Sequence, residues 1–143
     1  MIEEDYACRS KGQRCPTAVA AARADHMKRD DELIRDIMLT LEADPEPVVI
    51  FAPDDDVAAD RIRYYHMRLL ADAGFLEETG RHGGAFRITN AGHDFLCMMQ
   101  DAGFWAQIKA KAREAVPAYS LRLLFEIGDG LVRQQLRAAG LLP

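Results

Sequence analysis

The fold is decided by residues 61–89, RIRYYHMRLLADAGFLEETGRHGGAFRIT. The first part has the spacing of an amphipathic helix that runs to Asp72, and Gly74 stands where a helix ends in a left-handed cap. Two short runs of strand-forming residues follow, 75–79 and 85–89, and a glycine-rich turn separates them. The stretch therefore predicts a helix, a glycine stop and an antiparallel hairpin.

The helix predicted at 57–72 has two different faces. One face is apolar and is expected to pack on the core through Ile62, Tyr65, His66, Leu69, Leu70 and Ala73. The other face is expected to be exposed, and it carries Arg61, Tyr64 and Arg68, with Arg63 and Met67 beside them. Followed by a hairpin with a basic tip, this pattern is typical of the recognition helix and wing of a winged-helix domain.

A helix and a strand are predicted before this unit. The first strongly amphipathic helix ends at Asp44-Pro45, because a residue that precedes proline avoids helical geometry. The β-branched run at 47–51 is bounded by prolines and indicates an edge strand. Only nine residues separate Phe51 from Arg61, so the helix that normally supports a recognition helix is expected to be a single turn or missing.

Further helices are predicted after the hairpin. Asn90 is the expected cap of the next helix, which Gly103 is expected to end. Another helix begins at Phe104-Trp105 and ends at Pro117, and the last one begins near Tyr119. Trp105 is interpreted as a core anchor that joins these helices to the helix and hairpin predicted at 57–89, which together form the hairpin unit.

The expected fold is α+β, mostly helical, with a winged-helix core and appended C-terminal helices. Residues 1–26 are expected to form an N-terminal appendage, weakly structured or partly helical. The winged-helix core is assigned to 27–101, and the helices at 102–143 are expected to pack on it.

Composition and charge limit the function of the 143-residue chain. The formal net charge is −5, whereas proteins that grip phosphates usually carry a basic surface, so any DNA contact needs a local basic patch. No apolar run is long enough to cross a membrane, and the acidic start lacks the apolar core of a secretory signal, so we expect a cytoplasmic protein. The three cysteines, Cys8, Cys15 and Cys97, lack the spacing of a zinc site, and we expect no metal.

Several motifs occur in an order that resembles the DUF2513 family. They are the segments 27–30, 65–70, 73–76 and 88–96, followed by the segment around Trp105. The resemblance covers roughly residues 27–140. It implies a small bacterial or phage protein with a winged-helix core, and it implies no established activity.

DNA binding, in the manner of a transcription regulator, is the first functional hypothesis. The residues expected to contact duplex DNA are Arg61, Arg63, Tyr64, Arg68, Arg81, His82 and Arg87. However, residues 54–90 carry five arginines and seven acidic residues, which is a poor balance for counterion release.

Protein binding is the alternative hypothesis. An adaptor, or a phage inhibitor of a host protein, could keep the winged-helix fold without DNA binding, and tyrosine, methionine and arginine are enriched in interface cores. The last helix could equally pair with a second copy of the chain as a homodimer. Catalysis is not expected, because no nucleophile has an identifiable base and the glycines at 80–84 fall within a hairpin, so no cofactor is expected either.

Overall fold

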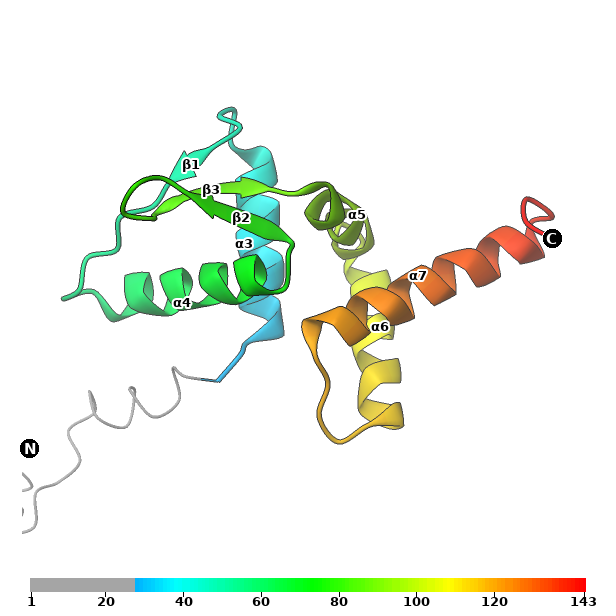
Figure 1. Cartoon of the computed structure of the whole chain (residues 1–143). Coiled ribbons are helices and arrows are strands. Elements are labelled where there is room, and N and C mark those ends of the chain that lie inside the picture. Colours follow the sequence, from blue (N-terminus) through cyan, green and yellow to red (C-terminus); the bar gives the residue numbers. More distant parts are fainter. Residues whose placement is uncertain (1–27) are drawn as a thin grey trace, which may run out of the picture. The chain divides into compact units, whose positions relative to one another are not determined.

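The computed structural model describes residues 28–143, of which Asp31–Pro143 form one compact unit (Figure 1). This unit is mostly helical and contains one small antiparallel sheet, so the expected α+β class is confirmed. Its elements are α3 (Asp31–Ala43), β1 (Val49–Ile50), α4 (Ala58–Asp72), β2 (Leu76–Thr79), β3 (Ala85–Ile88), α5 (Asn90–Met99), α6 (Ala102–Ala115) and α7 (Leu121–Ala138). The appendage predicted at 1–26 lies outside the described residues.

The sheet has the order β1-β3-β2, and all its pairings are antiparallel. Val49 pairs with Phe86, and Leu76 pairs with Ile88. Because side chains alternate along a strand, Val49, Phe86 and Leu76 share the inner face, which packs on α3 and α4. The predicted edge strand is therefore confirmed, although it is shorter than the five residues expected.

The chain between β1 and α4 forms a turn and no helix. The backbone N–H of Asp56 donates to the side chain of Asp54 (3.0 Å), and the N–H of Val57 donates to the Asp54 carbonyl (3.0 Å). This aspartate turn leads directly into α4. It agrees with the expectation that the supporting helix is a single turn or missing.

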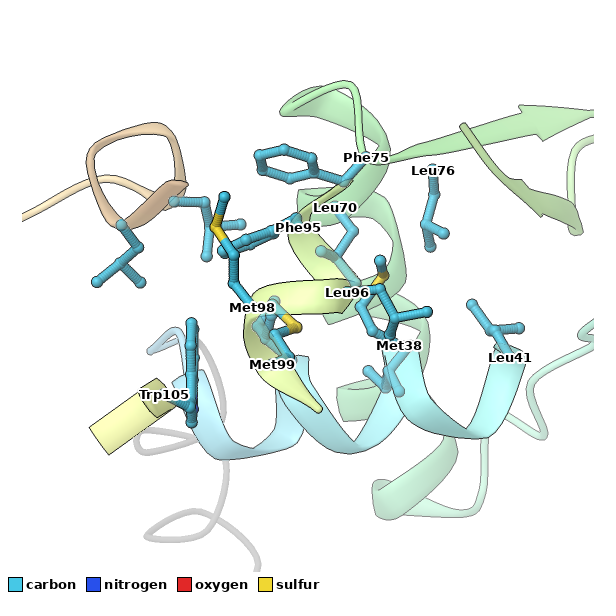
Figure 2. Packing of buried hydrophobic residues seen from close by; sticks show 14 of the residues in the cluster. Met38, Leu41, Leu70, Phe75, Leu76, Phe95, Leu96, Met98, Met99 and Trp105 are labelled. Carbon is cyan, nitrogen blue, oxygen red and sulfur yellow. The ribbon is translucent and has the colours of Figure 1, made fainter. Parts of the chain in front are cut away.

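A single hydrophobic cluster joins α3 to the later helices (Figure 2). Met38 and Leu41 of α3 belong to the same cluster as Leu70 of α4, and Phe95 of α5 lies edge-on to Trp105 of α6, with ring centroids 5.7 Å apart. Trp105 is 1% exposed, so its predicted role as a core anchor is confirmed. No helix in residues 28–143 is both long and apolar enough to span a bilayer.

The buried face of α4 differs from the prediction. Met67, which was expected to be exposed, is 2% exposed, and the ring of Tyr64 packs against the same cluster. Leu69, which was expected in the core, is only half-buried and lies outside the cluster, as do Ile62 and Tyr65. His66 and Leu70 are buried as predicted, but the rest of the predicted face is wrong because apolar residues occupy both sides of this helix. Simultaneous packing on α3 and β2, which the sequence does not show, selects the buried side.

Two helix boundaries also differ from the prediction. Thr89, not Asn90, caps α5, because its extended backbone brings its hydroxyl within 3.0 Å of the Gly92 N–H. Gly103 does not end a helix and lies in the first turn of α6 instead. The break falls just before it, where the Asp101 carboxylate accepts from the N–H of Phe104 at 2.7 Å.

Replacement of Leu70 by alanine should lower the free energy of unfolding by about 2–5 kcal/mol, because Leu70 is fully buried and its loss leaves a cavity. The matched change Leu69→Ala removes a half-buried side chain of the same size and should cost about 1 kcal/mol or less. Urea denaturation followed by circular dichroism measures both values. A larger loss for Leu69→Ala than for Leu70→Ala would contradict the observed facing of α4.

Candidate interaction surface

The structure places the seven predicted contact residues at three locations, which are α4, the hairpin tip and the outer face of the sheet. Arg61, Arg63, Tyr64 and Arg68 lie on α4, whereas Arg81 and His82 form the exposed tip of the hairpin. Arg87 lies on β3 between the inward-facing residues Phe86 and Ile88. It therefore points to the outer face of the sheet, opposite to α4. The predicted set does not form one continuous surface.

Carboxylates of the same chain neutralise three of these arginines. Arg63 pairs with Asp36 of α3 at 3.4 Å, and Arg68 pairs with Glu78 of β2 at 3.5 Å. Arg87 pairs with Glu77, its direct cross-strand neighbour. Such partly exposed pairs contribute little to stability, but each one cancels a positive charge on the surface. Arg61 and Arg81 form no ion pair with any residue of the described chain.

Glu78 fixes the hairpin to α4. One of its carboxylate oxygens, Oε1, accepts from the Tyr64 hydroxyl at 2.9 Å and from the Gly84 backbone N–H at 3.0 Å. The guanidinium of Arg68 lies 5.7 Å from the centre of the Tyr64 ring. Tyr64, which was expected to be free for a partner, is therefore engaged within the fold.

The role of Glu78 was not predicted, although the sequence contains a signal for it. Glu78 follows Leu76 by two residues and so points to the same inner face of the sheet. A carboxylate at an inward position of a strand needs hydrogen-bond donors, and the tyrosines of the preceding helix were the candidates. Which tyrosine would supply the donor depends on the facing of α4, and the prediction placed Tyr65 instead of Tyr64 on the buried side.

The surroundings of Glu78 shift two pKa values in opposite directions. The Gly84 N–H holds the pKa of Glu78 below its ordinary value, with the Tyr64 hydroxyl and Arg68 acting in the same direction against the effect of burial. The pKa of Tyr64 is raised, first by its hydrogen bond to Glu78 and then by burial. Both shifts favour an ionised Glu78 beside a protonated Tyr64 at neutral pH.

The segment that contains β1 is strongly acidic. Residues 42–60 contain seven carboxylates and neither lysine nor arginine. Asp54, Asp55 and Asp56 are exposed just before α4, where the positive end of the helix dipole favours negative charge. The start of α4, which would lead into a DNA groove in a winged-helix complex, is therefore negatively charged.

An open groove of about 320 Å³ lies beneath β1. It is bounded by the end of α3, the segment that leads into β1, and β3. Its apolar lining includes Leu41, Val49 and Ile88, and its carboxylates are those of Glu42, Asp44 and Glu46. Arg87 and His93 also line it, and Arg87 is paired with Glu77.

The change Glu78→Ala should lower the free energy of unfolding by about 1.5–3 kcal/mol at neutral pH, because it removes an acceptor that two donors share. Glu77→Ala, on the exposed face of the same strand, should cost about 1 kcal/mol or less. Urea denaturation measures both values.

The pH dependence gives an independent check on Glu78. The folded state lowers the pKa of Glu78, so this group stabilises the wild-type fold above its ordinary pKa, and that contribution is lost as the pH falls through the lowered value. Between about pH 5 and pH 3, the stability of the wild type should fall more steeply than that of Glu78→Ala. Parallel acid limbs for the two proteins would contradict this assignment.

Comparison with known proteins supports the family that the motifs indicated. The family described as "Hypothetical protein (DUF2513)" matches residues 28–117, which include α3, the whole sheet, α4, α5 and α6. No curated protein and no solved structure gives a significant match. The family match covers more than half of the chain. The chain belongs to the DUF2513 family.

Proposed function

We propose that this protein is a non-catalytic module that acts by binding another protein. The pairing of Arg63, Arg68 and Arg87 with carboxylates of the same chain carries this proposal. DNA affinity arises largely from cations that replace the counterions of phosphate groups. Each of these arginines would have to leave its own carboxylate before it could bind a phosphate group. The freed carboxylate would then face the phosphates and repel them.

The order of the elements from α3 to β3 supports DNA binding as a second candidate function. A helix, a strand, a second helix and a hairpin follow one another, and the first strand lies beside the last, as in winged-helix domains. Arg61 at the start of α4 and Arg81 and His82 at the hairpin tip are accessible basic groups. Fold analogy does not decide between the two functions, because winged helices serve both.

Fluorescence anisotropy with a labelled random duplex separates the two candidates. From about 50 to 200 mM salt, we expect the wild type to bind more weakly than ordinary non-specific DNA-binding proteins, for which Kd is about 10⁻⁴–10⁻⁶ M at physiological salt. The change Asp36→Asn frees the guanidinium of Arg63 and should strengthen binding and steepen its salt dependence. Asp94→Asn changes the net charge equally at an exposed position of α5 and is the matched control. Tight, strongly salt-dependent binding by the wild type would overturn the proposal.

Cross-linking in cells provides a positive test of protein binding. The full chain, carrying a photo-reactive residue in place of exposed Ile50, should form adducts that resist nuclease and disappear on proteolysis. Adducts that nuclease removes would favour the DNA-binding candidate instead.

We also propose that the second half of α7 is a self-association surface. Leu131, Val132 and Leu136 are only half-buried there, and Leu141, just beyond the helix, is 71% exposed. Pairing of two helices would bury this apolar stripe. Sedimentation velocity should show a dimer at high protein concentration that Leu136→Ser weakens and the neighbouring Gln134→Ser leaves intact. A monomer at every concentration would contradict this pairing.

A further inference from the structure

We propose that β1 is a docking edge at which an extended, basic segment of a partner protein adds to the sheet as a fourth strand. This inference rests on the proposed function of protein binding. It specifies the surface that is used and the chemistry of the segment that binds there.

The backbone of β1 has an open side. The Phe51 N–H donates to the Gly84 carbonyl at 2.7 Å, and Val49 pairs with Phe86, so the backbone groups of these two residues face β3. In an antiparallel ladder the backbone groups of Ile50, between them, then point away from β3. Figure 1 shows β1 at the rim of the sheet, and the Ile50 side chain is 81% exposed.

The prolines near β1 leave this open side usable. Natural edge strands are commonly protected by proline, which removes a backbone donor. Pro47 and Pro53 bracket the strand and limit its length, but neither occupies position 50, whose N–H points outward. The edge can therefore accept a short partner strand, while the prolines oppose extended edge-to-edge aggregation.

Apolar side chains and a groove accompany the open backbone. Alternate side chains of an added strand would lie toward Ile50 on the outer face and toward the groove on the inner face. In that groove, Leu41 and Val49 offer apolar contact beside the carboxylates of Asp44 and Glu46. A lysine or arginine fits this combination, because its alkyl stem can cover apolar surface while its charge reaches the carboxylates.

The negative charge near β1 determines which class of molecule can bind at this edge. The seven carboxylates of residues 42–60 repel phosphate groups and acidic peptides. They also oppose pairing of β1 with β1 of a second copy, since that pairing would bring two such segments together. A basic segment of a different protein is the complementary occupant.

The test uses the full chain and a labelled peptide of about ten residues in which lysine and valine alternate. We expect this peptide to bind in fluorescence anisotropy, and the equivalent peptide of glutamate and valine not to bind. Ile50→Pro removes the outward N–H without removing a hydrogen bond to β3, and should weaken binding by about tenfold or more. The matched control Ile50→Thr keeps the N–H and should stay within about threefold of the wild type.

A second pair of variants tests the charge separately. The double change Asp44→Asn with Glu46→Gln should weaken binding of the lysine peptide and reduce its dependence on salt. Asp94→Asn with Asp129→Asn removes the same charge from α5 and α7 and should have little effect. If thermal melting shows that Ile50→Pro does not fold, this comparison of charge variants still tests the binding of the basic peptide.

The outcomes separate failure of this inference from failure of the proposed function. If Ile50→Pro folds and binds the lysine peptide as tightly as the wild type does, strand addition at β1 is overturned. Equal binding by the Asp44/Glu46 variant and wild type, or binding of the glutamate peptide, would overturn the basic partner. Either result leaves protein binding in place if nuclease-resistant adducts form in cells, whereas tight, salt-dependent DNA binding by the wild type removes the function on which the inference rests.

Discussion

The arrangement of the hairpin unit depends on the contact between the start of α5 and the end of α4. The Thr89 hydroxyl donates to the Gly74 carbonyl at 2.6 Å and accepts from the Gly92 N–H, while the Thr89 N–H donates to the Phe75 carbonyl at 3.1 Å. A Cβ at position 92 would lie 2.0 Å from the Phe75 oxygen, so only glycine permits this approach. One residue therefore ties α4, β2 and α5 together, and the tilted rings of Phe75 and Phe95 pack in the core with their centroids 4.5 Å apart.

The carboxylates that hold this unit together also weaken it as a DNA-binding surface. Glu78 is needed on the inner face because Tyr64 and the Gly84 N–H require an acceptor there, yet its second oxygen lies 3.5 Å from Arg68. Asp36 similarly joins α3 to α4 through Arg63. Arg63 and Arg68 are thus paired with carboxylates of the same chain, and neither adds an unpaired positive charge to the surface.

The sequence was informative where the local backbone decides the structure. Gly74 has a φ of 84°, so the predicted left-handed helix end is confirmed, and the hairpin follows where strand-forming residues and glycines placed it. The facing of α4 could not be predicted, because Leu69 and Leu70 are equally apolar and only packing on α3 and β2 distinguishes them. The Glu78–Tyr64 contact joins residues fourteen positions apart and depends on that same facing, so it could not be predicted from the sequence either.

The turn between β1 and α4 brings negative charge to the start of α4 and to the edge of the sheet. In a helix-turn-helix this position holds the supporting helix, which crosses the DNA backbone. Here Asp54 closes a short turn instead, with its backbone N–H bonded to the side chain of Asp60 (3.2 Å), so negative charge borders both the start of α4 and the end of β1. A surface that repels phosphates beside an unpaired strand edge is better suited to a basic polypeptide than to a nucleic acid, because a polypeptide can satisfy the exposed backbone as well as the charge.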